Sequence, residues 1–151
     1  MVIFTLSISN NILQLIFLCG KIFKDNRWMV MEEKKKNFLI QNGVDVEAGI
    51  ENTMDFETYN EILLDFCESF PQEVNKFNEY KNAGDMVNYE IIVHALKSNC
   101  RTLGFNEMGE MFYAHEQASK QNDINYVNTH YEELINAVKK TYNILNTYKG
   151  L

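Results

Sequence analysis

Four side chains that could carry chemistry lie in one short stretch at residues 94–104, "HALKSNCRTLG". They are His94, Lys97, Ser98 and Arg101, spaced three or four residues apart. At about 100° per residue, these side chains project from a helix within a sector of about 100°. The apolar residues of the same helix fall on the opposite side, so we expect His94 to point away from the core. That apolar stripe consists of Tyr89, Ile92, Val93, Leu96, Cys100 and Leu103.

An exposed histidine beside two cations suits phosphoryl chemistry. Nearby positive charge disfavours the imidazolium, and neutral imidazole is a nucleophile. Lys97 and Arg101 could hydrogen-bond the oxygens of a phosphoryl group on His94, and the small Ser98 leaves room beside the ring. The sequence has no P-loop and no glycine-rich phosphate cradle, so another protein would have to supply and receive the phosphoryl group. A plainer interpretation also fits, in which His94 is an ordinary solvated residue of a polar helix face.

The elements that must position this stretch begin with a long helix. From Asp55 onward, apolar residues recur at helical spacing, and Pro71 marks either a kink or the end of that helix. The sequence "NAGD" at 82–85 supplies a glycine stop and an aspartate N-cap for the next element. A short helix over 46–53 precedes the long one, with Asp45 as its N-cap.

Three further helices are expected after residue 85, at 86–103, 106–121 and 124–148. Gly104 is predicted to end the helix that carries His94. Because the connections are short, neighbouring helices should run antiparallel. The predicted fold class is therefore all-α: an antiparallel up-down four-helix bundle, with a short N-terminal helix and an apolar N-terminal extension.

The N-terminal extension differs from the rest of the chain. Residues 2–20 are apolar but interrupted by two asparagines and a glutamine, and basic residues follow them. This length is borderline for a membrane span, and a secretory signal would carry its positive charge first. A mis-assigned translation start upstream of Met31 fits these residues better than either. We therefore divide the chain into an extension at 1–31, either mis-assigned or a weak membrane helix, and a helical domain at 32–151.

Composition limits the classes of function. The net charge of −7 argues against nucleic-acid binding. The three cysteines are odd in number and fit no metal motif, which favours a reduced, cytoplasmic setting with Cys67 and Cys100 in the core. No histidine follows a glutamate by three residues, so the Glu-x-x-His pairs of di-iron bundles are missing and no metal site is expected.

The stretch "HALKSNCRTLG" resembles the His-x-Leu-Lys-(Gly/Ser)-x5-Gly signature of histidine-containing phosphotransfer (HPt) domains of two-component phosphorelays. The similarity extends over roughly residues 42–148. "GVDVEAGIENTMDFETYNEILLDF" looks like the entry helix and first long helix of that family. "AHEQASKQND" looks like the end of the helix after the motif, with His115 where leucine is common.

The resemblance implies roles for individual residues. His94 would accept the phosphoryl group, and Lys97, with Arg101 nearby, would support it. Ser98 takes the small-residue position, where glycine is more frequent, and Gly104 ends the helix. One of two residues on the next helix, Glu116 or Gln117, is expected to reach the imidazole and fix its tautomer.

The resemblance also implies a function and partners. The chain would be a phosphocarrier without its own kinase apparatus, exchanging phosphate with the receiver domain of a response regulator or a hybrid histidine kinase. It would need no cofactor, because Mg²⁺ belongs to the receiver. We expect a cytoplasmic monomer that binds no nucleic acid and touches a membrane only if residues 1–30 insert. The alternative is a helical interaction adaptor in which His94 is never phosphorylated.

Overall fold

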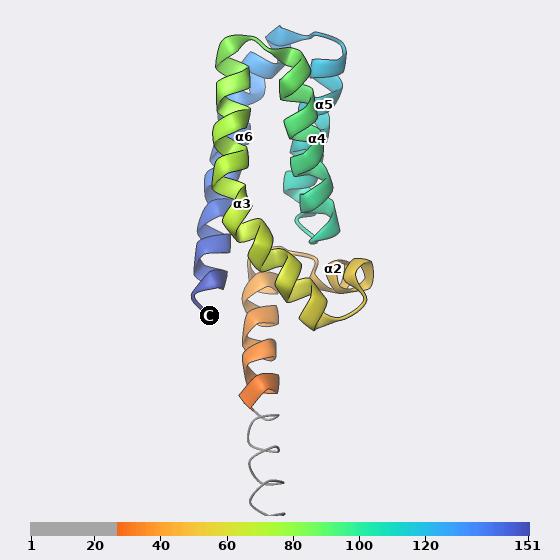
Figure 1. Cartoon of the computed structure of the whole chain (residues 1–151), viewed down its shortest axis with the longest axis vertical. Helices are drawn as coiled ribbons and strands as arrows, with labels where there is room; N and C mark the ends of the chain where they lie inside the picture. The colour runs from red at the N-terminus through yellow and green to blue at the C-terminus, as the bar shows by residue number, and fades with distance from the viewer. Residues whose placement is uncertain (1–26) are drawn as a thin grey trace, which may run out of the picture. The chain divides into compact units, whose positions relative to one another are not determined.

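The computed structural model describes residues 27–151, so the apolar stretch 2–20 lies outside the described residues. The chain divides into two compact units between Lys35 and Lys36. A helix covers residues 27–41, and the second unit, which carries His94, contains the other five helices that the structure describes (Figure 1). Between residues 27 and 151 the regular secondary structure is entirely helical, which confirms the all-α prediction.

Aspartate caps begin four of the five helices that follow the turn at residues 42–45. Each capping carboxylate accepts a backbone N–H from three residues further on, as Asp45 does from Ala48 and Asp85 does from Asn88. The last three helices differ from their predicted bounds by one residue at the C-terminal end. The five helices are α2 Val46–Thr53, α3 Phe56–Ala83, α4 Met86–Thr102, α5 Asn106–Lys120 and α6 Ile124–Lys149.

Helix α3 continues through Pro71 instead of ending there. Proline lacks the N–H that would bond the carbonyl of Cys67, and its ring crowds that carbonyl, so a bend is expected at this point. Figure 1 shows α3 bent, with Pro71 near the middle of its span. Of the two outcomes predicted for Pro71, the kink is the one that the structure has.

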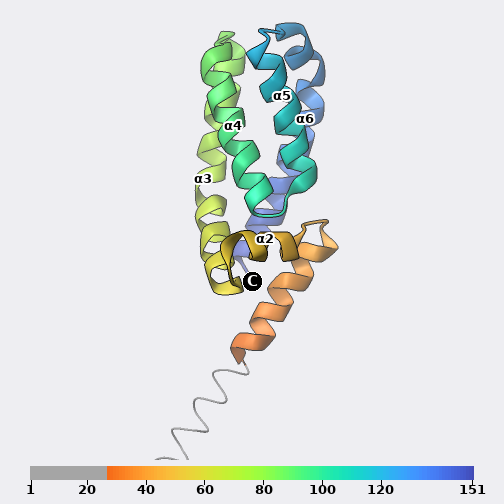
Figure 2. The same cartoon turned by 90° about the vertical axis from the view of Figure 1, so that its right-hand side faces the viewer.

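The four long helices α3 to α6 lie side by side in both views (Figures 1 and 2). α4 packs most extensively against α5, α3 contacts both α4 and α6, and α5 also contacts α6. Helix α2 packs against α3 and α4. Between residues 27 and 151 no helix is long and apolar enough to cross a membrane.

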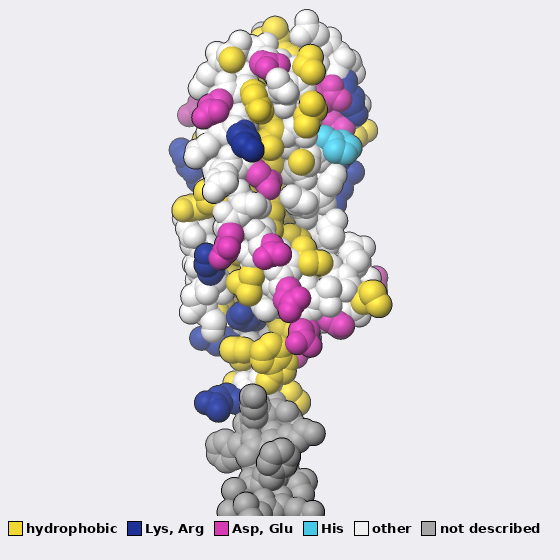
Figure 3. Space-filling model, viewed as in Figure 1, with side chains coloured by type: hydrophobic (Ala, Val, Ile, Leu, Met, Phe, Trp, Pro, Cys, Tyr) yellow, Lys and Arg dark blue, Asp and Glu magenta, His cyan; other side chains and the backbone are white. Residues whose placement is uncertain are grey.

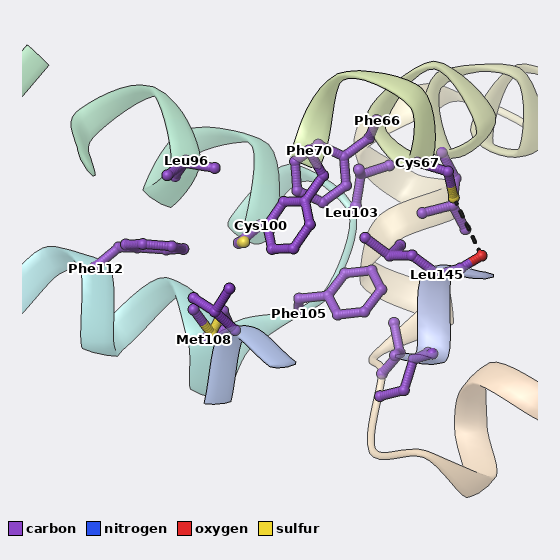
Figure 4. Close-up of a cluster of buried hydrophobic side chains, with 14 of the residues drawn as sticks. Phe66, Cys67, Phe70, Leu96, Cys100, Leu103, Phe105, Met108, Phe112 and Leu145 are labelled. Atoms are coloured by element: carbon purple, nitrogen blue, oxygen red, sulfur yellow. Dashed lines mark hydrogen bonds between the residues drawn. The ribbon is translucent and has the colours of Figure 1, made fainter. Parts of the chain in front are cut away.

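The core between these helices is rich in aromatic side chains. Figure 4 shows Phe66 and Phe70 of α3, Leu96 of α4 and Phe112 of α5 in one cluster of buried side chains. Cys67 and Cys100 are buried thiols in the same core, as predicted. Burial raises the pKa of the Cys100 thiol, which keeps it protonated and unreactive.

The turn between α4 and α5 depends on Gly104. Its φ of 82° is in the left-handed region, and a Cβ at this position would overlap the backbone carbonyl of Asp45. The N–H of Asp45 in turn donates to the carbonyl of Gly104 over 2.9 Å. This close backbone approach ties the start of α2 to the end of α4, and therefore fixes where α5 begins.

A glycine pair tests this contact. Gly84 has a similar φ of 67°, but a Cβ there would meet nothing within 4 Å. We expect Gly84→Ala to lower the free energy of unfolding by about 1 kcal/mol, the cost of left-handed backbone. Gly104→Ala adds the overlap and should cost roughly 2–4 kcal/mol. Equal losses for the two variants in urea unfolding would contradict the proposed role of the contact with Asp45.

Candidate functional site

Helix α4 presents His94 on its outer face. Val93, Leu96 and Cys100 of the same helix are fully buried, whereas the His94 side chain is 58% exposed. The orientation predicted from helical spacing is therefore confirmed. Figure 3 shows a histidine on the face that carries α3 and α4, with hydrophobic side chains near it.

Glu116 of α5 reaches His94 from the neighbouring helix. Its carboxylate is 1% exposed, and Oε1 lies 2.7 Å from His94 Nδ1. Two lysines bind the same carboxylate: Lys97 Nζ lies 2.6 Å from Oε2, and Lys120 Nζ lies 2.6 Å from Oε1. A buried carboxylate thus binds three basic groups, two of them on α4 and one on its own helix. We call this cluster of His94, Lys97, Glu116 and Lys120 the carboxylate cluster.

The cluster selects one tautomer of the imidazole. An ionised carboxylate only accepts hydrogen bonds, so the short contact requires a proton on Nδ1 of His94. Lys97 Nζ lies 3.3 Å from the same Nδ1 but can only donate, so its hydrogen bond goes to Glu116 Oε2 at 2.6 Å. In the neutral ring, Nε2 then carries the free electron pair.

Glu116 remains ionised at neutral pH. Burial by itself would raise the pKa of this carboxyl group, but hydrogen bonds from His94, Lys120 and Lys97 outweigh burial and lower the pKa to about 2. The negative charge that orients His94 is therefore present throughout the physiological range.

Lys97 occupies a more enclosed position than the helical wheel indicates. Its side chain is only 12% exposed, because the ammonium group folds against the buried carboxylate of α5. Spacing along one helix cannot predict this, since the enclosing residue belongs to the adjacent helix.

Arg101 points along α5 instead of toward Glu116. Its guanidinium donates to Glu110 over 2.7 Å and lies 5.1 Å from the ring centroid of Tyr113. Gly109 makes room for it, because a Cβ there would come within 2.8 Å of Arg101 Cγ. Lys97 Nζ lies 5.9 Å from the same Tyr113 ring, so this aromatic side chain borders both cations.

Three other predicted residues have clear positions. The Ser98 hydroxyl donates to the carbonyl of His94 over 2.9 Å and stays exposed beside the ring. Gly104 lies in the turn between α4 and α5, as described above. Gln117 follows Glu116 by one residue and therefore projects about 100° further around α5. Of the two candidates for orienting the imidazole, Glu116 is the one that contacts it.

His115 has a structural position in the core. It is 2% exposed, and the Tyr89 hydroxyl forms a hydrogen bond of 2.8 Å with its Nδ1. Burial lowers the pKa of His115 to about 4, so the ring is neutral at physiological pH. His115 thus packs inward from α5 while Glu116, the next residue, faces His94.

Sequence analysis missed two residues of the site, Lys120 and Tyr113. Lys120 was detectable, because a glutamate followed by a lysine four residues later is a standard helix pair. Tyr113 precedes Glu116 by three residues and so shares its helix face, but nothing in the sequence marks that face as the one that meets α4.

Comparisons with known proteins do not indicate a function for this chain. No family model, curated protein or solved structure gave a significant match to the chain. Across residues 27–151, the structure holds no group of three or more histidine, cysteine or acidic side chains suited to a metal ion.

The low pKa of Glu116 predicts an acid-dependent loss of stability. The unfolded carboxyl titrates near 4.5 and the folded one near 2, so the unfolded state binds the proton more tightly between these values. Stability contributed by Glu116 is present above about pH 5 and is lost as the pH falls toward 2. The fall in unfolding free energy from pH 7 to pH 3 should be smaller in Glu116→Gln than in the wild type, by about 2 kcal/mol.

Glu110→Gln is the matched control for this measurement. Glu110 lies on the same helix and binds Arg101, but its side chain is 65% exposed, so this variant should keep the wild-type pH dependence. If the unfolding free energy of Glu116→Gln, measured in urea, falls between pH 7 and pH 3 by as much as that of the wild type, the carboxylate cluster does not hold the charge as described.

Proposed function

We propose that this protein is a phosphocarrier that accepts a phosphoryl group on Nε2 of His94 and passes it on. The observation that carries the proposal is the buried Glu116 carboxylate at 2.7 Å from His94 Nδ1, on a ring that is otherwise 58% exposed. This contact leaves the second ring nitrogen unprotonated and accessible. The resemblance of residues 94–104 to the HPt signature supports the same interpretation.

The transfer step can be written with these residues. The electron pair on His94 Nε2 attacks phosphorus, the P–O bond to a receiver aspartate breaks, and its electron pair stays on the aspartate carboxylate. The phosphorylated ring keeps its Nδ1 proton and becomes cationic, and the adjacent Glu116 anion stabilises that charge. Lys97 supplies positive charge toward the phosphoryl oxygens, and Arg101 is proposed to add to it from the same face.

The proposed partner is a receiver domain, which would supply the reacting aspartate and its Mg²⁺. Two apolar side chains on the His94 face are exposed: Ile91 by 63% and Val87 by 71%. They lie three and seven residues before His94, and therefore on the same side of α4. Docking of a partner over His94 would bury them and exclude water from the reacting atoms.

The remaining parts of the proposal concern fold and setting. We infer that α3 to α6 form an antiparallel up-down four-helix bundle, supported by their sequential packing and the short connections between them. The chain would act as a cytoplasmic monomer, with no kinase activity and no cofactor of its own. If His94 is never phosphorylated, the exposed Ile91 and Val87 would instead suit a helical interaction adaptor.

Phosphotransfer to His94 is the direct test. Receiver domains phosphorylated on aspartate are mixed with the protein, and phosphate on the chain is assayed for acid lability and base stability. We expect the wild type to be labelled and His94→Gln to lose the label, because glutamine has no nucleophilic ring nitrogen.

His130→Gln is the matched control, since His130 is a partly exposed histidine on α6 whose ring contacts the backbone carbonyl of Tyr126. This variant should be labelled like the wild type. Equal labelling of His94→Gln and wild type, or no label on the wild type from any receiver, would reject the phosphocarrier function.

A further inference from the structure

One oxygen of Glu116 is shared between the imidazole and a lysine. Oε1 lies 2.7 Å from His94 Nδ1 and 2.6 Å from Lys120 Nζ, whereas Lys97 occupies Oε2. Lys120 follows Glu116 by four residues on α5 and its side chain is 44% exposed. It therefore contacts the oxygen that orients His94 while remaining at the surface.

Sharing this oxygen weakens the carboxylate as a base. A cation bound to Oε1 stabilises the anionic form, and two donors at one oxygen divide its electron density. The hydrogen bond to Glu116 correspondingly raises the pKa of Lys120, which keeps the ammonium charged. Lys120 thus offsets the negative charge of Glu116 and disfavours the cationic, Nδ1-protonated ring that phosphorylation creates.

The position of this proton controls how readily a phosphorylated imidazole gives up its phosphoryl group. When phosphate leaves, the N–P electron pair returns to Nε2. A ring that still carries the Nδ1 proton leaves as neutral imidazole, whereas a ring that has lost the proton would leave as an anion. A protonated phospho-imidazole is therefore the better donor.

We propose that Lys120 is a positioning residue that offsets the Glu116 charge, lowers the share of phosphorylated His94 that carries the Nδ1 proton, and so lengthens the life of the N–P bond. This inference rests on the proposed phosphocarrier function, which it deepens. Lys120 acts through Glu116, and Lys97 cannot replace it because Lys97 binds the other carboxylate oxygen.

The test measures how long phosphate stays on His94. The protein is loaded with phosphoramidate, a small chemical donor that needs no receiver domain, in a His130→Gln background. His115 is buried, so His94 is then the accessible histidine of the three in the chain. The half-life of the phosphate is followed by ³¹P NMR in wild type, Lys120→Gln and Lys120→Arg.

We expect Lys120→Gln to shorten the half-life about two- to five-fold, the range of an ion pair with one partly exposed partner. Lys120→Arg, which keeps the charge, should restore the wild-type value. Lys139→Gln, which removes an exposed lysine of α6, is the matched control and should have no effect. Circular dichroism melts of the same variants report any general loss of stability separately.

A half-life in Lys120→Gln that is equal to or longer than that of the wild type would overturn the inference. This result is distinct from failure of the phosphocarrier function, which would appear as no transfer from phosphorylated receivers to wild-type His94. Phosphoramidate loads the ring without a receiver. The half-life of phosphate on His94 can therefore be measured whatever the result of the transfer experiment.

Discussion

The buried carboxylate of Glu116 is the interaction on which the site depends. A charged group with 1% exposure is stable only when it is fully paired, and this one binds His94, Lys97 and Lys120 at 2.6–2.7 Å. These contacts join α4 to α5 at the position where the imidazole emerges. The same contacts determine which ring nitrogen carries the proton, so the packing of two helices and the chemistry of one side chain have a common cause.

The alignment of α4 with α5 places this carboxylate. Consecutive residues of α5 contact α4 on two sides: His115 bonds Tyr89 within the core, and Glu116 bonds His94 near the surface. The α4–α5 turn allows this alignment, because Gly104 adopts a conformation and a backbone contact that a side chain would prevent. A turn far from the imidazole is therefore part of what positions it.

The sequence predicts much of this arrangement, because helix ends and helix faces are local properties. Aspartate caps, Gly84 and Gly104, and the regular apolar spacing are enough to place α4 to α6 almost to the residue, and to turn His94 outward. Contacts between helices are a different matter. The choice of Glu116 over Gln117, the enclosure of Lys97 and the direction of Arg101 toward Glu110 all depend on how α5 is rotated against α4, which the spacing within either helix does not contain. The course of α3 through Pro71 was likewise open, because proline either bends a helix or ends it.

We propose that Glu116 holds the Nδ1 proton of His94 and leaves Nε2 as the nucleophile. Long-range ¹H–¹⁵N NMR of the imidazole, recorded at a pH where the ring is neutral, measures this directly. We expect a protonated, pyrrole-like Nδ1 and an unprotonated, pyridine-like Nε2 for His94. A neutral ring with its proton on Nε2, the tautomer that free histidine favours, would contradict it.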